Sequence, residues 1–276
     1  MGPMGRSIDV DGLVNARDLG GLRRKDGTIT PRGVFFRSEN IDWVRPTGWD
    51  QLRALGVRTA VDLRQPAERA RDVQARPPWL TTVTVDLDGP ENTAFWKDYW
   101  DNGLCGTALY FIPHLVAMPE RAGRVLSALA HAPAGGVLFH CMSGRDRTGL
   151  ISLLLLTAVD AEPEEIVSDY METVRLGDVR AAAAQGKNAE PMCEDICAIR
   201  GTTTEGAFRD AIRRLDLAWF YTAAHMDPRD VDAIGTWRGN ICTTPPSTAI
   251  QSPRGSCSRT APTRRRPIAG GGRHST

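Results

Sequence analysis

Long hydrophobic runs are missing from this chain of 276 residues. The longest apolar stretch, Leu150 to Val159, is too short to span a bilayer and is interrupted by Ser152 and Thr157, so we expect a buried central helix there. No internal repeat is visible. An apolar signal segment is also missing from Met1 to Val10, and we therefore expect a cytoplasmic protein.

The cysteines are not spaced as they are in a disulfide framework or a zinc site. The chain has six cysteines, and without a signal segment this number favours a reducing compartment. Cys193 and Cys197 are spaced to share one helix face, but no second Cys/His pair follows at a zinc-like interval. We therefore expect no metal and no other cofactor.

Acidic residues and lysine are absent from the end of the chain. The whole chain has 34 Lys and Arg against 33 Asp and Glu, but six of the arginines lie after Asn240. Removing these six leaves 28 basic residues against 33 acidic ones in residues 1–239. This mildly acidic part argues against nucleic acid as a partner.

Composition divides the chain into two parts. Residues 1–239 are expected to form one domain, with a helical C-terminal part at about 160–239. Residues 240–276 are rich in Pro, Ser, Thr, Gly and Arg, have few apolar residues, and are expected to be a disordered basic tail. A solvated tail is favoured over contact with an anionic membrane or an acidic partner. The sequence does not indicate the oligomeric state.

The densest group of reactive side chains lies between Val137 and Leu156. A short apolar strand leads to His140 and Cys141, and an apolar helix begins near Arg147. The first N–H groups of that helix point into the loop and make it a cradle for an anion. The residues expected around a bound phosphate are Met142, Ser143, Gly144, Arg145, Asp146 and Arg147.

The residue types in this loop indicate phosphate chemistry. Cys141 is expected to lie beneath a tetrahedral phosphate while the planar guanidinium of Arg147 binds two of its oxygens, which lysine cannot do. The helix N-terminus, the loop amides and Arg147 favour the reactive thiolate. Thr148 is expected to donate its hydroxyl to the sulfur, and His140 to hold the loop from behind.

His140 and Cys141, followed after five residues by Arg147, Thr148 and Gly149, resemble the signature loop of cysteine-dependent protein-tyrosine and dual-specificity phosphatases. Upstream blocks resemble the bacterial atypical tyrosine and lipid phosphatases, and the similarity extends over about residues 8–175. These blocks are Asn15–Gly21, Val34–Ser38 and Val61–Arg64 with Pro66 and Glu68. Such relatives typically carry lysine where this chain has Arg145.

The upstream blocks contain three arginines, Arg17, Arg37 and Arg64. Arg64 follows an apolar strand, at the edge where open α/β sheets place their ligand sites. Taken alone, each arginine fits a surface ion pair or a solvated turn equally well. The resemblance instead favours support of the catalytic loop, with Glu68 orienting Arg64.

A cysteine phosphatase needs an acid to protonate the leaving oxygen. Asp146 is the first candidate, because the resembling enzymes are thought to use the acid in this position. Asp88 is the second candidate, with Asp86 beside it in a turn before Gly-Pro. An irregular aromatic stretch follows, from Phe95 to Trp100, and is expected either to close over the site as a lid or to form a small core.

Alternating strands and helices predict an α/β fold with a mostly parallel central sheet and helices on both faces, and the resemblance narrows this to a protein-tyrosine-phosphatase-like fold. The predicted activity is phosphate monoester hydrolysis through a phosphocysteine, above all on protein phosphotyrosine. The same chemistry on a phosphoinositide, nucleotide or other small-molecule phosphate is one alternative. A non-catalytic phosphate-binding module is another, and a rhodanese-like sulfur transferase fits the upstream blocks poorly.

Overall fold

A five-stranded sheet lies at the centre of the computed structural model, which describes residues 5–72, 74–104 and 106–239. The strand order is β1-β2-β5-β3-β4, with β1 antiparallel to β2 and every other pair parallel. This confirms the predicted mostly parallel sheet. The strands are β1 (Arg17–Asp18), β2 (Phe35–Ser38), β3 (Val57–Asp62), β4 (Thr81–Thr84) and β5 (Gly136–His140).

Helices surround this sheet. In chain order they are η1 (Ile41–Trp43), α1 (Pro46–Ala54), α2 (Pro66–Arg69), α3 (Thr93–Tyr99), η2 (Ala108–Tyr110), α4 (Phe111–Ala117), α5 (Pro119–Ala130), α6 (Asp146–Ala158), α7 (Pro163–Arg175), α8 (Gly177–Ala183), α9 (Glu190–Ile199), α10 (Thr204–Arg214), α11 (Leu217–Ala223) and α12 (Pro228–Gly235). Within the described ranges, none of these helices has the length and apolar character that a membrane crossing requires.

The helices begin where the sequence supplies starting signals. Proline occupies the first turn of α1, α5, α7 and α12, where its missing N–H costs no hydrogen bond. Thr203 and Asp227 cap α10 and α12 through their side-chain oxygens. After α1 the chain turns at Gly56, whose φ of 85° favours glycine.

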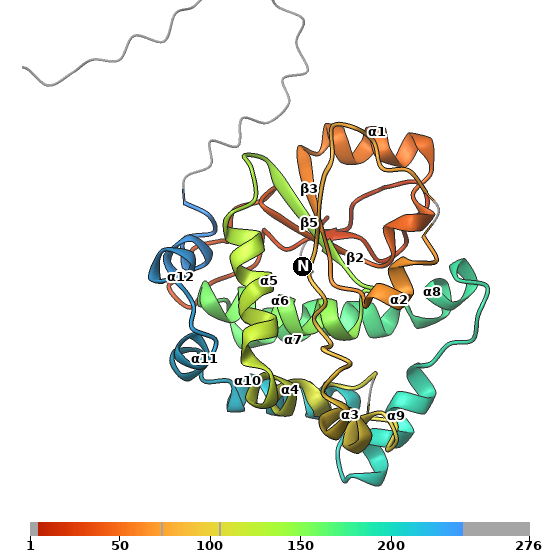
Figure 1. The fold of residues 1–276 in the computed structure, drawn as a ribbon, viewed down its shortest axis with the longest axis vertical. Coiled ribbons are helices and arrows are strands. Elements are labelled where there is room, and N and C mark those ends of the chain that lie inside the picture. Colours follow the sequence, from red (N-terminus) through yellow and green to blue (C-terminus); the bar gives the residue numbers. More distant parts are fainter. Residues whose placement is uncertain (1–4, 73, 105, 240–276) are drawn as a thin grey trace, which may run out of the picture. The chain divides into compact units, whose positions relative to one another are not determined.

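Apolar side chains cover both faces of the sheet. Trp49 and Leu52 of α1 pack with Leu138 of β5 in one buried cluster. Phe139, the next residue of β5, belongs to a larger cluster with the side chains of α5, α6 and α7. Successive strand residues point to opposite faces, so a strand with two buried faces is apolar throughout. Figure 1 shows α1 on one side of the strands and α6 and α7 on the other.

The central strand and the helix after it determine where the site lies. In β5, His140 pairs in register with Ser38 of β2 and Asp62 of β3, so three parallel strands end side by side. The chain then turns through a loop into α6, whose residues Thr148 to Leu156 are all buried. A helix that is apolar on all sides belongs in a core, which confirms the predicted buried central helix.

One prediction about local structure is wrong, and one helix was missed. The stretch around Phe95 and Trp96 is not irregular but forms α3, which Asn92 caps at its start, and both side chains are buried in the larger core. Helix α11 was not predicted, although Asp216 caps it and Phe220 anchors it in the core. Both helices have seven residues, too few for a clear periodic pattern.

Some predictions fall outside the described residues. The expected basic tail, 240–276, is among them, so the division into a domain and a tail stays a prediction. Residues 176–201, which belong to the predicted helical C-terminal part, are described and contain α8 and α9.

A buried ion cluster connects α7 with the first two strands. The Asp169 carboxylate of α7 accepts hydrogen bonds from Arg6 at 2.8 Å, Arg17 at 2.8 Å and Arg37 at 2.5 Å. All four side chains are less than a tenth exposed. Burial alone raises the pKa of a carboxyl group, but the three guanidinium groups outweigh it and hold the pKa of Asp169 well below its usual range. The cluster is therefore charged.

We expect Asp169→Asn to destabilise the fold by about 3–5 kcal/mol, because three buried arginines lose their shared negative charge. Urea unfolding measures this change. Glu164→Gln on the same helix is the matched control: Glu164 is exposed and pairs with the exposed Arg209, so little change is expected. Equal stability losses in the two variants contradict the importance of the cluster.

Candidate active site

The predicted nucleophile lies at the bottom of the loop between β5 and α6. Cys141 is 1% exposed, and the Thr148 hydroxyl lies 3.1 Å from its Sγ, as expected for a group that donates to the sulfur. Thr148 and Arg147 belong to the first turn of α6, so the free N–H groups of this helix face the loop. The electrostatic interaction with Cys141 is among the causes that raise the pKa of Arg147.

The carbonyl groups of the loop are bound from outside. The Asn40 N–H donates to the Met142 carbonyl at 3.0 Å, Asn15 Nδ2 donates to the Ser143 carbonyl at 3.3 Å, and Arg37 Nη2 donates to the Gly144 carbonyl at 2.7 Å. The outside of the loop is thus tied to the parts of the chain before and after β2.

Glycine is required at position 144. Gly144 has φ of 68°, and a Cβ atom added there would lie 2.7 Å from both the Ser38 carbonyl oxygen and the Glu39 nitrogen. A side chain at position 144 would therefore force the backbone after β2 to move.

Arg147 is held by two carboxyl groups. Its Nη2 lies 2.8 Å from Glu68 Oε1, its Nη1 also donates to Glu68, and Nη1 lies 3.1 Å from Asp88 Oδ2. Burial disfavours the charge of Arg147, but these partners outweigh it and hold its pKa above the ordinary value. Glu68 was predicted to orient Arg64; its ion pair is instead with Arg147.

Asp88 and Asp86 have different surroundings. Asp88 is 6% exposed and accepts from Gln65 Nε2 at 2.8 Å as well as from Arg147. Burial raises the pKa of Asp88 to about 6, although Arg147 opposes this shift. Asp86 accepts from the backbone N–H groups of Asp88 and Gly89, so it is the one that shapes the turn.

The aromatic helix α3 supports the Asp88 loop from below. Trp96 Nε1 donates to the Asp88 carbonyl at 2.9 Å. Its ring lies 4.4 Å from Trp100 and 6.0 Å from the buried His114, centroid to centroid. Of the two predicted roles for this stretch, the structure supports the small core for Phe95 and Trp96, while Trp100 is 39% exposed.

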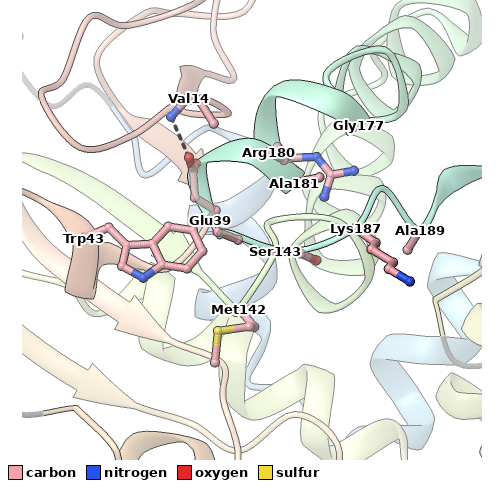
Figure 2. A pocket seen from close by; sticks show the side chains of 11 residues that line it. Val14, Glu39, Trp43, Met142, Ser143, Gly177, Arg180, Ala181, Lys187 and Ala189 are labelled. Carbon is pink, nitrogen blue, oxygen red and sulfur yellow. Dashed lines mark hydrogen bonds between the residues drawn. The ribbon is translucent and has the colours of Figure 1, made fainter.

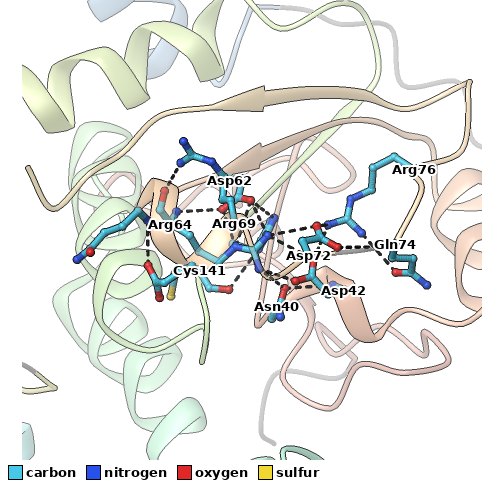
Figure 3. Close-up of polar contacts among 12 residues, drawn as sticks. Asn40, Asp42, Asp62, Arg64, Arg69, Asp72, Gln74, Arg76 and Cys141 are labelled. Carbon is cyan, nitrogen blue, oxygen red and sulfur yellow. Dashed lines mark hydrogen bonds and ion pairs between the residues drawn. The ribbon is translucent and has the colours of Figure 1, made fainter.

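Arg64 lies in a network on the opposite side of the loop. It donates to Asp62 and Asp42, and Asp42 also binds Arg76. Figure 3 shows Cys141 beside the Arg64 end of this network. His140 lies between the two: its Nδ1 is 3.2 Å from the Cys141 carbonyl oxygen, while its Nε2, at 3.9 Å from Asp62, makes no hydrogen bond with the described residues. Burial lowers the pKa of His140 to about 4, so its ring is neutral at pH 7.

Arg145, the residue that differs from the resembling enzymes, has protein partners on all sides. Its Nε and Nη2 bind the Glu190 carboxylate at 2.8 Å each, and its Nη1 lies 3.0 Å from the Tyr170 hydroxyl. It also donates to the Gly106 carbonyl and lies 3.2 Å from Asp146. Its side chain therefore links the catalytic loop to α9, and its predicted contact with a substrate stays a prediction.

Sequence reasoning missed two acidic residues of the site, Glu39 and Glu190, and paired Glu68 with Arg64 instead of Arg147. Glu68 had a readable signal, since it forms a capping box with Gln65 at the start of α2. Glu39, which accepts from the Val14 and Asn15 N–H groups, and Glu190 had none, because their partners are distant in sequence. In the described part of the chain no three His, Cys, Asp or Glu side chains are grouped to hold a metal ion.

Comparison with known proteins agrees with this geometry. The triple specificity protein phosphatase PtpB of Mycobacterium tuberculosis is 30% identical over 192 residues, which cover 60% of this chain and 68% of the relative. A tyrosine-protein phosphatase of Nostoc commune is 31% identical over 147 residues, covering 52% and 49%. A protein of Cupriavidus necator, named provisionally as a tyrosine-protein phosphatase, is 29% identical over 174 residues, covering 59% and 61%.

This chain therefore spans less than two thirds of the length of the Cupriavidus and Nostoc relatives. The model of the tyrosine phosphatase family matches residues 8–236, which include both the catalytic loop and the helices after it. The chain belongs to the tyrosine phosphatase family.

Proposed function

We propose that this protein hydrolyses phosphate monoesters through a phosphocysteine and that phosphotyrosine in proteins is its substrate. The observation that carries the proposal is the Thr148 hydroxyl 3.1 Å from Cys141 Sγ, in a loop that Arg147 and the start of α6 make positive. Family membership and the names of the relatives support the same reaction.

The reaction has two steps. Cys141 Sγ attacks phosphorus and forms the S–P bond while the P–O bond to the leaving group breaks and an acid gives its proton to the departing oxygen. Arg147 and the loop amides stabilise the charge on the other phosphate oxygens. Water then attacks phosphorus and gives a proton to the carboxylate that the first step left, the S–P bond breaks, and Thr148 stabilises the departing thiolate.

Two carboxyl groups are candidates for the acid. Asp146 is part of the loop and lies at the start of α6. Asp88 contacts Arg147, and its pKa of about 6, raised by burial, keeps part of the population protonated near neutral pH, as a general acid requires. Substitution of the true acid slows poor leaving groups more than good ones, so the two candidates can be told apart by measurement.

A small phosphorylated molecule is the second candidate substrate. A free cation beside the cradle would favour a substrate with several negative charges, but Arg145 is bound to Glu190, which weakens this candidate. The proposed compartment is the cytoplasm, since the cysteines of the described residues are free thiols.

We expect Cys141→Ser to abolish hydrolysis of phenyl phosphate while phosphate esters still bind, because serine lacks a comparably acidic nucleophile. The native enzyme is quenched during turnover and examined by mass spectrometry, which should show a mass increase of one phosphoryl group at Cys141. Cys193→Ser on α9 is the control and should remain active. Continued hydrolysis by Cys141→Ser rules out the mechanism, and binding without turnover by the native protein leaves a phosphate-binding module.

The acid is assigned by comparing Asp88→Asn with Asp146→Asn. Loss of the acid should slow the hydrolysis of phenyl phosphate about 10²–10⁴-fold. The hydrolysis of p-nitrophenyl phosphate should slow much less, because a good leaving group needs no proton. If Asp88 is the acid, kcat/KM falls as pH rises through about 6, since its proton is lost there, and Asp88→Asn removes this decline. Asp86→Asn is the control. A uniform loss on both substrates contradicts an acid role for the residue changed.

The substrate class is decided by comparing phosphotyrosine peptides with phosphoserine peptides, phosphoinositides and nucleotide monophosphates. We expect the highest kcat/KM on phosphotyrosine peptides, because the deep position of Cys141 suits a long phenyl phosphate. Higher kcat/KM on a small polar phosphate contradicts the proposed substrate but leaves the phosphocysteine mechanism in place.

A further inference from the structure

A pocket of about 350 Å³ lies beside the catalytic loop. Met142 and Ser143, the two residues that follow Cys141, form one of its borders. Two residues of extended chain span at most about 7 Å, so the pocket begins within that distance of the nucleophile along the backbone. Its lining shares Met142 and Ser143 with the phosphate cradle but does not include Cys141, Asp146 or Arg147, so the pocket adjoins the cradle.

The walls of the pocket are mostly apolar. Its lining residues are Val14, Glu39, Trp43, Met142, Ser143, Gly177, Arg180, Ala181, Ala184, Lys187 and Ala189. Figure 2 shows the Trp43 ring on one side and Arg180 and Lys187 on the opposite side. The one acidic residue of the lining, Glu39, is buried and accepts hydrogen bonds from the N–H groups of Val14 and Asn15.

Positive charge is concentrated at one side of this pocket. Arg180 shares the carboxylate of Glu190 with Arg145, so two guanidinium groups face one carboxylate. Lys187 adds a further positive charge and is exposed. A negatively charged group of a ligand is therefore favoured at this side.

We propose that this pocket is a specificity subsite that takes an apolar side chain next to the phosphotyrosine of a protein substrate, with an acidic residue of the same peptide facing Lys187. The inference rests on the proposed function, because it assumes a phosphotyrosine in the cradle. Helix α8 supplies Arg180, Ala181 and the start of the loop that carries Lys187.

The character of the walls favours a peptide over a phosphoinositide headgroup. A headgroup is polar on every side and needs hydrogen-bond partners throughout, whereas the alanine side chains offer none, Met142 has only a weakly accepting sulfur, and Trp43 has one N–H donor. An apolar side chain fits these walls and gains by leaving water. The acidic neighbour then uses the charge at the rim without entering the pocket.

The test uses two phosphotyrosine peptides, one with Leu-Glu before the phosphotyrosine and one with Leu-Glu after it. Each is compared with a peptide that has Gly-Gly at the same place, and phenyl phosphate is the reference. For the native protein, kcat/KM of one of the two Leu-Glu peptides should exceed that of its Gly-Gly counterpart about tenfold. Ala181→Phe fills the pocket and should remove this advantage relative to phenyl phosphate. Lys187→Gln should lower it about threefold, and only for peptides that contain glutamate.

Matched controls exist for both variants. Ala182→Phe places the same ring on α8 at an exposed position outside the lining. Lys25→Gln removes a lysine beyond the far end of α6, where Lys25 contacts Asp160; the 13 residues of α6 span about 20 Å. Both controls should keep the preference for the Leu-Glu peptide.

Several outcomes overturn the inference. Equal kcat/KM on Leu-Glu and Gly-Gly peptides, with phenyl phosphate hydrolysed, removes the subsite but keeps the proposed function. A preference that persists in Ala181→Phe places the recognition elsewhere. If Ala181→Phe instead affects only phosphatidylinositol phosphate in vesicles, the pocket holds a headgroup. Absence of hydrolysis of every substrate, phenyl phosphate included, defeats the proposed function and the subsite together.

Discussion

The catalytic loop keeps its shape because buried arginines hold it from behind. Asp169 binds Arg6, Arg17 and Arg37, and Arg37 also binds the Gly144 carbonyl. Burying a charge costs several kcal/mol, so the arrangement depends on the attraction of the shared carboxylate and on the hydrogen bonds that the guanidinium groups make. Burial lowers the pKa of Arg37 to about 10, which still leaves it charged at pH 7. With the carbonyl oxygens bound outside, the loop N–H groups remain directed toward an anion.

The same principle applies to the groups that meet the substrate. Glu68 and Asp88 hold the Arg147 guanidinium, and Thr148 holds the Cys141 sulfur. Groups that are already oriented need no reorganisation when charge develops on the phosphate, and this is the main source of electrostatic catalysis. Asp88 has a double position in this scheme, since it contacts the essential arginine and carries a carboxyl group that burial makes less acidic.

Arg145 joins the loop to two of the helices after α7. Arg145 extends from the loop to Glu190 on α9, and Glu190 also binds Arg180 on α8. The same segment forms one side of the pocket next to Ser143. In the proposed function the loop performs the chemistry while α8 borders the neighbouring pocket, so differences in α8 and in the chain that follows it would change the preferred substrate and leave the reaction the same.

The sequence by itself determined the fold class, the strand-loop-helix motif and the residues of the loop, because these depend on local patterns: an apolar strand, a fixed spacing from Cys141 to Arg147, and an apolar helix. It also placed Arg17, Arg37 and Arg64 near the site through resemblance. Only the tertiary structure decided their partners. Asp169 lies 132 residues from Arg37, Glu68 lies 79 residues from Arg147, and Glu190 lies 45 residues from Arg145. Such pairs form when packing of the sheet and helices brings distant segments together, and no local pattern records them.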